Sequence, residues 1–337
     1  MNKGFVLFLL LSTPAFNSIA ADNSLDSAIE NGLKYLESVQ LDRGEFPTIF
    51  TPNVPEPARS LNASFDSNVF TTAMLADALY SIKNPRVERM QKKVVSFLQA
   101  QLHSEDGLWS YFTTHNPAPL YPNTIYDLDD TAFASIVLQQ NQITFPNNVT
   151  AIKANKNQDG LYLTFVLPPK ESNDIDCGVN ANVISYLQEN DPAVCRYLNE
   201  QVATGKNCAE YYTLLDAYYL ISRAYASGIS CLEPSTPAIT NYVLNQFDQQ
   251  NGSVNDSPFK TAIALNTLQF LKYQGPEIQQ ARAYLLNTQS THTGAWPADD
   301  FWLWAGTDDE GNEIMMGRSS SSALTTAIAL RALSGLR

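Results

Sequence analysis

One short motif recurs five times along this chain, and each copy separates two segments of helical character. An apolar segment is followed by a glutamine, a short polar stretch, and a glycine with an aromatic or apolar residue two places later. Each glycine lies where a helix would end, because glycine readily adopts the left-handed backbone that closes helices. The five glycines are Gly44, Gly107, Gly160, Gly252 and Gly294. Repeats of this kind predict an array of helical hairpins.

The segments that follow the turns also resemble one another. Four of them open with Thr-Ala and one with Asn-Ala-Asn. These openings lie at Thr72, Thr131, Asn180, Thr261 and Thr326. The runs are small and apolar nearly all round, which is typical of buried helices, whereas the segments before the turns are one-sided.

Alternating outer and inner helices predict an all-α fold, a closed α/α toroid (barrel) of about six helical hairpins with no substantial sheet. Five hairpins carry the motif, and the sixth is expected around residues 211–228, in the long gap between two of the glycines. Six hairpins can close a ring. An open solenoid is the structural alternative.

The longest insertions all lie between a turn and the inner helix that follows it. They are residues 47–65, 113–126, 166–173 and 299–322. Since each follows the same kind of turn, we expect all four at one end of the barrel. Loops at one end of a regular scaffold are the usual place for a binding or catalytic site.

The N-terminal segment, residues 1–20, has the pattern of an export signal. Lys3 provides a positive start, residues 5–11 are an unbroken apolar run, and small residues precede a cut expected near Ala20. A retained anchor helix is the alternative, although the apolar run is short for crossing a bilayer. We therefore expect a single toroid domain over residues 21–337, exported to the periplasm or secreted, with no transmembrane segment in the mature chain.

The balance of charged residues argues against two classes of partner. Lys and Arg number 21 against 34 Asp and Glu, which gives a net charge of −13. A surface this acidic argues against nucleic-acid binding, because that binding depends on positive side chains displacing counterions from phosphates. It argues equally against electrostatic attachment to anionic lipid.

Four cysteines lie close together in the second half of the chain, and in an exported protein an even number favours disulfides. Four cysteines allow three pairings. We favour Cys195–Cys208, which would close a short polar stretch, together with Cys177–Cys231. A zinc site is the alternative, but the spacings fit no CxxC pattern and the chain has only three histidines.

An acidic cluster opens one of the inner helices, in the run Asp127-Leu128-Asp129-Asp130-Thr131-Ala132. Three carboxylates within four residues repel one another. In a partly buried site this repulsion raises at least one pKa and leaves a proton donor at neutral pH. The alternative is that Asp127 and Asp130 only cap the helix, where acids interact favourably with the helix dipole.

This hexapeptide resembles the Asp-x-Asp-Asp-Thr-Ala motif of class II terpenoid cyclases, the squalene–hopene cyclase group. The turns at residues 40–46, 101–109 and 289–296 resemble the QW repeats of the same group. The likeness covers about residues 25–337. It implies the α/α toroid of a superfamily that also contains protein prenyltransferase β-subunits.

The resemblance implies an isomerase or cyclase that acts on an isoprenoid-like, apolar small molecule without a cofactor. In this family the middle aspartate protonates an alkene, a role that falls on Asp129 here, while Asp127 and Asp130 orient and polarise it. A histidine often assists the acid. His115 and His292 are the candidates, because both lie in loops on the side of the turns.

A second acidic pair precedes the next inner helix. Residues 174–180 align without a gap on residues 127–133, so that Asp174 matches Asp127 and Asp176 matches Asp129. We expect all four carboxylates at one mouth of the barrel, where they could contact substrate, act as acid and base or hold a divalent cation. Reuse of a good helix cap is the alternative. The other candidates for substrate contact are Asn180, Asn182, Trp302 and Trp304.

Three functions are consistent with these features. The first is the cyclase-like enzyme. The second is a carbohydrate-active α/α barrel, similar to a polysaccharide lyase or glycosidase, in which Asp129 and Asp176 would be acid and base if about 6.5–9.5 Å apart. The third is a toroid that binds a ligand without chemistry. A deep, dry, aromatic pocket favours the first, an open groove with surface aromatics the second, and a filled mouth the third.

Overall fold

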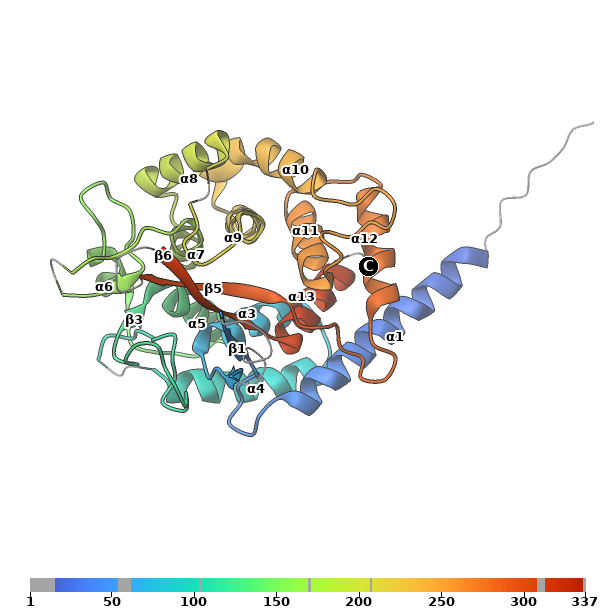
Figure 1. Cartoon of the computed structure of the whole chain (residues 1–337), viewed down its shortest axis with the longest axis horizontal. Coiled ribbons are helices and arrows are strands. Elements are labelled where there is room, and N and C mark those ends of the chain that lie inside the picture. The colour runs from blue at the N-terminus through green and yellow to red at the C-terminus, as the bar shows by residue number, and fades with distance from the viewer. Residues whose placement is uncertain are drawn as a thin grey trace, which may run out of the picture.

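The computed structural model describes residues 16–53, 62–102, 105–168, 171–206, 208–307 and 313–335. Over these residues, six inner helices form a closed ring in which each helix packs against the next and the last packs against the first (Figure 1). They are α3 (Val69–Leu79), α5 (Leu128–Gln140), α7 (Cys177–Leu187), α9 (Leu214–Ala226), α11 (Pro258–Phe270) and α13 (Ser322–Ser334).

An outer layer of helices surrounds this ring (Figure 1). In the described part of the chain it consists of α1 (Phe16–Val39), α4 (Pro85–Ala100), α6 (Val149–Ala154), α8 (Pro192–Thr204), α10 (Thr236–Leu244) and α12 (Glu277–Thr288). The 3₁₀ helix η1 (Ser230–Ser235) leads into α10. The predicted all-α toroid of six hairpins is therefore confirmed, and the ring is closed rather than an open solenoid.

The two layers differ in burial as their sequences predict. Every residue of α3 is buried, including its threonines and Asp77. Helix α4 instead buries one face, with Val87, Met90, Val94 and Phe97 at the three- and four-residue spacing of a one-sided helix. The ring is thus held together by the small apolar inner helices, and the outer helices cover it.

The recurring threonine ties each turn to its inner helix. In all five copies of the motif, the backbone N–H two residues after the turn glycine donates a hydrogen bond to the threonine or asparagine near the start of the inner helix. The acceptors are Thr72, Thr131, Asn180, Thr261 and Thr326, with N···O distances of 2.9 to 3.1 Å. Asn180, expected at the polar mouth, therefore belongs to the hairpin scaffold instead.

The turn glycines are required by the packing of each turn against a neighbouring outer helix. A Cβ on Gly44 (φ +99°) would lie 2.1 Å from the carbonyl oxygen of Lys93, and one on Gly294 (φ +78°) would lie 2.4 Å from that of Asn31. The motif glutamine completes the contact, because Gln40 Nε2 donates to the carbonyl of Gly44 at 2.9 Å.

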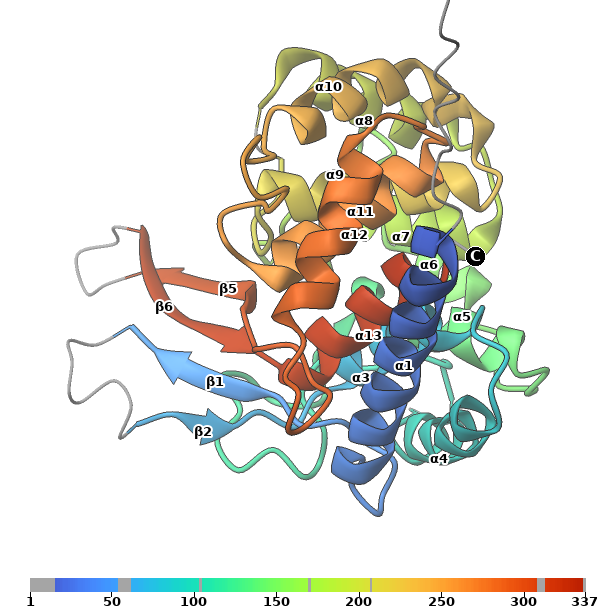
Figure 2. The ribbon, with the colours of Figure 1, turned by 90° about the vertical axis from the view of Figure 1, so that its right-hand side faces the viewer.

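The long insertions form a small sheet that the sequence analysis did not predict. Its strands are β1 (Ile49–Pro52), β2 (Ser64–Phe65), β5 (Asp300–Thr307) and β6 (Glu313–Ser320), all antiparallel in the order β2-β1-β6-β5. A second, two-stranded pair consists of β3 (Tyr126–Asp127) and β4 (Phe165–Val166). Figure 2 shows the four-stranded sheet projecting from one end of the helical ring.

The disulfides pair differently from the prediction. All four cysteines lie in the described residues, and they form Cys177–Cys208 and Cys195–Cys231 with no free thiol. The predicted pairing is wrong because it joined cysteines of different layers. Cys177 begins α7 and Cys208 lies in the segment leading to the neighbouring inner helix, whereas Cys195 on α8 faces Cys231 on η1 in the outer layer.

Helix α1 begins at Phe16, so the cut predicted near Ala20 falls in its first turns. The rest of the predicted export signal, residues 1–15, lies outside the described residues, as do the side chains of residues 16–23. No helix in the described ranges combines the length and the apolar character needed to cross a membrane.

Candidate functional site

The acidic cluster lies at the start of α5 and is fully buried. Asp127 is the N-cap of the helix, and its Oδ1 accepts a hydrogen bond from the backbone N–H of Asp129 at 2.7 Å. Asp129 and Asp130 follow in the first turn, and all three residues have no exposed surface. Asp127 therefore performs the capping that we considered for the cluster, and Asp129 is not needed for it.

Two neighbouring inner-layer segments supply hydrogen bonds to Asp129. Asn182 on α7 donates from Nδ2 to Asp129 Oδ1 at 2.6 Å, and the hydroxyl of Tyr212, which lies just before α9, donates to Oδ2. Behind Asn182, the guanidinium of Arg223 donates to Asn182 Oδ1 at 3.4 Å. The Asp129 side chain is thus held between α5, α7 and α9, inside the ring.

Burial separates the protonation states of the three carboxyls. Desolvation raises the pKa of Asp127 and of Asp130 well above the ordinary value, and repulsion from the charge of Asp129 adds a smaller rise to both. Among the described residues, neither oxygen of Asp130 has a hydrogen-bond partner. An unpaired buried carboxylate is costly, so burial favours the protonated form of Asp130.

Asp129 differs from its two neighbours. Burial raises its pKa to about 6, while the hydrogen bonds from Tyr212 and Asn182 and the charge of Arg223 oppose that rise. A carboxyl that titrates near physiological pH can both hold a proton and release it, as a general acid must. The sequence analysis placed mutual repulsion first, whereas in the structure desolvation dominates.

The second acidic pair lies at the same end of the barrel but in a different register from the predicted one. Asp176 is the N-cap of α7, and its oxygens accept from the backbone N–H groups of Gly178 (2.6 Å), Val179 (3.2 Å) and Glu210 (2.6 Å). It is therefore the counterpart of Asp127, two residues away from the alignment we expected. Asp174 is half-buried and accepts from the Tyr211 hydroxyl at 2.6 Å.

An aromatic cap closes the mouth above Asp129. Trp302 of β5 is 2% exposed; its ring stacks on Tyr211 with centroids 5.2 Å apart and lies 5.0 Å from the rings of Tyr212 and Phe70. Beside Phe301 only about 10 Å³ of space remains, about the minimum for one water molecule. The candidate Trp304 lies in the same strand, but its side chain is outside the described part of the structure.

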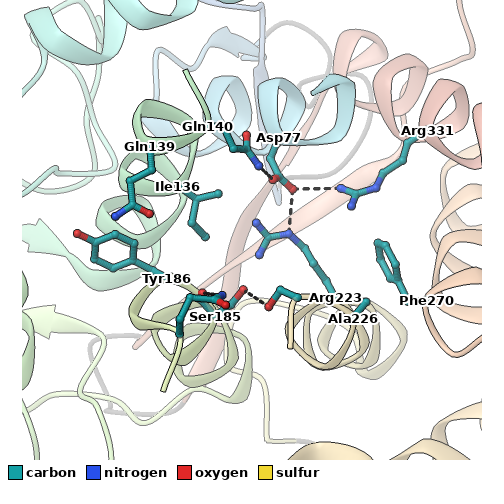
Figure 3. Close-up of a pocket in the computed structure, with 12 residues that line it drawn as sticks. Asp77, Ile136, Gln139, Gln140, Ser185, Tyr186, Arg223, Ala226, Phe270 and Arg331 are labelled. Atoms are coloured by element: carbon teal, nitrogen blue, oxygen red, sulfur yellow. Dashed lines mark hydrogen bonds and ion pairs between the residues drawn. The ribbon is translucent and has the colours of Figure 1, made fainter. Parts of the chain in front are cut away.

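The opposite end of the barrel is open. A cavity of about 430 Å³ lies at the C-terminal ends of the inner helices (Figure 3). At its floor, Asp77 Oδ2 accepts from Arg223 Nε at 2.9 Å and from Arg331 Nη1 at 3.1 Å. Gln140 donates to the other oxygen of Asp77 at 2.8 Å. The two guanidiniums hold the pKa of Asp77 far below its usual range.

A continuous polar chain therefore runs through the barrel from the closed mouth to the open cavity. It passes from Asp129 to Asn182, Arg223, Asp77 and Arg331. The sequence analysis missed the last three. A signal for two of the charges was present, because Asp77 and Arg331 are each the single charged residue of an otherwise uncharged inner helix.

The two histidines expected to assist the acid are not at the cluster. His115 and His292 are both exposed in surface turns, and no contact between either of them and the three carboxyls is found in the described structure. Tyr212 and Asn182 occupy the positions that we expected a histidine to fill. Within the described ranges, no group of three His, Cys, Asp or Glu residues is arranged to hold a metal ion.

The chain matches no protein-family model and no curated protein sequence. Solved structures do share its fold. The type II terpene cyclase MstE from Scytonema, in its apo form, superposes with a TM-score of 0.71 at 19% identity, over 94% of this chain and 98% of that chain. The same cyclase in complex with geranylgeranyl dihydroxybenzoate, described as its substrate, gives a TM-score of 0.67 at 17% identity and the same coverage.

Sugar-converting enzymes share the architecture more distantly. A D-mannose isomerase gives a TM-score of 0.55 at 14% identity, over 97% of this chain and 100% of that chain. Cellobiose 2-epimerase from Spirochaeta thermophila gives 0.52 at 12% identity, over 96% and 99%. The chain thus has a terpene cyclase-like α/α-toroid fold, and at these identities the likeness concerns the fold alone.

Proposed function

We propose that this protein is an acid-initiated cyclase or isomerase of the class II terpene cyclase type, with Asp129 as the proton donor and an isoprenoid-like, apolar alkene as substrate. The observation that carries the proposal is the state of Asp129. It is fully buried, its pKa is raised to about 6, and aromatic rings lie above it.

The reaction would begin with transfer of the Asp129 proton to one carbon of a C=C bond. The O–H bond breaks, a C–H bond forms, and the neighbouring carbon becomes a carbocation. A second C=C bond of the substrate attacks that carbon to close a ring, and loss of a proton from an adjacent carbon gives an isomer of the substrate. No oxidant, reductant or co-reactant is needed.

Residues around Asp129 fit this sequence of events. The hydroxyl of Tyr212, the amide of Asn182 and the charge of Arg223 stabilise the carboxylate that remains after proton transfer. The faces of Trp302 and Tyr212 can stabilise the carbocation. Because the space beside Tyr212 and Phe301 is only about 10 Å³, a substrate must displace the aromatic cap before it reaches the acid.

The comparisons support the proposal at the level of the scaffold. MstE is described as a type II terpene cyclase, and the alignment spans 98% of its chain. Export from the cell and periplasmic or secreted localisation remain part of the proposal, and the two disulfides of the structure are compatible with them.

The test is an incubation with a panel of polyprenyl compounds that begins with geranylgeranyl dihydroxybenzoate, followed by mass spectrometry of the products. We expect an isomer of unchanged mass in water that gains one deuterium when the reaction runs in D₂O. The Asp129→Asn variant keeps shape and polarity but lacks the acidic proton, so its turnover should fall by at least about 10³-fold. Product without deuterium, or product formed equally by Asp129→Asn, would overturn the proposal.

The filled mouth is the one observation that favours the alternative of a non-catalytic toroid. If no member of the panel is converted, and none shifts the melting temperature, that alternative replaces the cyclase. The carbohydrate-active alternative has less support. Both oxygens of Asp176 already accept backbone N–H groups, so this residue is poorly placed to act as a base toward Asp129.

A further inference from the structure

The cavity at the C-terminal end of the ring contains an uneven set of charges. Its lining includes two guanidiniums, Arg223 and Arg331, and one carboxylate, Asp77. The other lining residues are uncharged, and they include the amides of Gln139, Gln140 and Gln188 and the hydroxyls of Ser185 and Ser227. The formal charge of the lining is therefore +1. A volume of about 430 Å³ is in the range of ordinary small-molecule sites.

The two arginines keep donors available after their ion pairs with Asp77. A guanidinium has five N–H groups. Arg223 uses Nε for Asp77 and Nη1 for Asn182, and Figure 3 shows its terminal nitrogens on the side of Ile136. Arg331 uses Nη1 for Asp77 and lies over the ring of Phe270 at 4.8 Å, with its side chain 19% exposed.

The missing counter-charge is Asp129. It lies behind Arg223 and is joined to it through Asn182. When Asp129 is ionised, the chain from Asp129 to Arg331 has two negative and two positive charges. When Asp129 is protonated, one guanidinium has no counter-charge.

The other groups that face Asp129 do not balance that guanidinium. Asp127 and Asp130 lie at the start of its own helix, and burial raises the pKa of both well above the ordinary value, which favours their uncharged forms. Asp176 at the start of α7 has its pKa raised to about 7, but its oxygens are bonded to three backbone N–H groups rather than to Arg223. Tyr212 before α9 is neutral because its pKa is raised well above 10. The positive charge of Arg223 is therefore balanced only by Asp77, by ionised Asp129 and by any anion in the cavity.

We propose that this cavity binds a small oxyanion, a carboxylate or a phosphate group, on Arg223 and Arg331, and that the anion and the proton on Asp129 bind cooperatively. An anion beside Arg223 offsets the charge that stabilises ionised Asp129, so the carboxyl becomes easier to protonate. By linkage, protonation of Asp129 must strengthen anion binding by the same factor. The proposal does not depend on the alkene chemistry proposed above.

The expected affinity is modest. The inner helices present their C-terminal ends to this cavity, and the partial negative charge there favours cations. This opposes part of the attraction from the arginines, so we expect a dissociation constant on the order of 1 mM. Allosteric coupling between two sites is typically about 5- to 150-fold, and the Asn182 side chain between the two charges places this pair near the lower end.

The test is isothermal titration calorimetry with sodium sulfate at constant ionic strength, at pH 5 and pH 7.5. Sulfate does not titrate in this range. We expect it to bind about 5-fold more tightly at pH 5. Arg331→Gln should abolish binding, whereas Arg196→Gln, which removes the same charge from an exposed position on outer helix α8, should leave it unchanged. Acetate and methyl phosphate at pH 7.5 distinguish a carboxylate site from a phosphate site.

Two further variants address the site and the coupling separately. Ala226 lines the cavity and is exposed, so Ala226→Trp should fill the cavity without disturbing the ion pairs and should also prevent binding. This variant replaces Arg331→Gln if the latter fails to fold. Asp129→Asn should bind sulfate at both pH values with the affinity that the parent shows at pH 5. Binding that survives Ala226→Trp would overturn the site, and a pH dependence in Asp129→Asn as large as that of the parent would overturn the coupling.

Discussion

Asp129 is the residue whose environment says most about this protein. Burial raises the pKa of its two neighbours in the motif, Asp127 and Asp130, well above the ordinary value, and Asp127 alone caps the helix. Asp129 receives two side-chain hydrogen bonds and the field of a buried arginine, and it titrates near pH 6. Three carboxyls within four residues thus differ in pKa and in hydrogen bonding because their surroundings differ.

The stability of the protein should depend on pH through these carboxyls. Burial raises the folded-state pKa of Asp129 to about 6 and of Asp176 to about 7, above an unfolded value of about 3.9. A carboxyl with a raised folded-state pKa stabilises the fold fully below the unfolded pKa, and this contribution is lost as pH rises through the folded pKa. The free energy of unfolding should therefore fall by roughly 5 kcal/mol between pH 4.5 and pH 7.5, about 2 kcal/mol from Asp129 and about 3 kcal/mol from Asp176.

Urea denaturation at several pH values measures this change, and Asp129→Asn serves as its control. The variant removes one of the titrating groups, so its stability should depend less steeply on pH. Asp77, whose pKa is lowered, acts in the opposite direction only below about pH 4. A free energy of unfolding that rises between pH 4.5 and pH 7.5 would contradict the assignment.

At the scale of the element, the Thr-Ala opening of the inner helices has a specific structural cause. Thr72 accepts the buried N–H of Phe46, whereas the neighbouring Thr71 is also buried and its hydroxyl has no partner in the described structure. Thr72→Val should therefore cost about 1–3 kcal/mol by leaving a buried donor unsatisfied. Thr71→Val, with the same change of shape, should be neutral or slightly stabilising, and equal losses in the two variants would refute this explanation.

The two disulfides should differ in their effect on the site although they close loops of similar length. Their sequence separations are 31 and 36 residues, so removal of either should cost about 2–4 kcal/mol. Cys177–Cys208 anchors the segment that carries Tyr212, so Cys177→Ser with Cys208→Ser should also release Asp129 from that hydroxyl.

The Cys195→Ser, Cys231→Ser pair is the matched control for this change. Its disulfide lies in the outer layer, so the pH dependence of stability should persist there while the melting temperature falls. A similar change of pH dependence in both double variants would show that Cys177–Cys208 has no special relation to the acid.

At the scale of the whole molecule, the charged network joins opposite sides of the ring. Asp77 on α3 bonds Arg223 on α9 and Arg331 on α13, and the side chains of Asp77 and Arg223 are 6% exposed.

Asp77→Asn leaves these two guanidiniums without their shared partner, and we expect the free energy of unfolding to fall by about 3–5 kcal/mol. The surface pair Arg318–Asp300 is about one-third exposed, so Asp300→Asn should cost less than about 1 kcal/mol. Thermal or urea unfolding of the two variants compares these losses, and a loss in Asp77→Asn no larger than that in Asp300→Asn would contradict the role of the network.

The amino-acid sequence was sufficient to predict the architecture, because each repeat can be recognised from residues that are close together in the sequence. A glycine that tolerates a left-handed turn, a threonine that accepts the N–H of that turn and a small apolar helix are all recognisable without knowledge of the fold. The same local pattern identified Asp127, Asp129 and Asp130 as unusual, since three adjacent acids at a helix start are uncommon on any scaffold.

What surrounds Asp129 was decided only by the closed ring. Asn182, Arg223 and Asp77 lie on three different inner helices, and no local pattern says which inner helices face one another across the axis. The disulfides pair cysteines of the same layer, not cysteines that are close in sequence. Trp302 is the buried centre of the aromatic cap because β5 pairs with β6 above the mouth. Burial, which is a property of the assembled molecule, then set the pKa values that distinguish an acid from a cap.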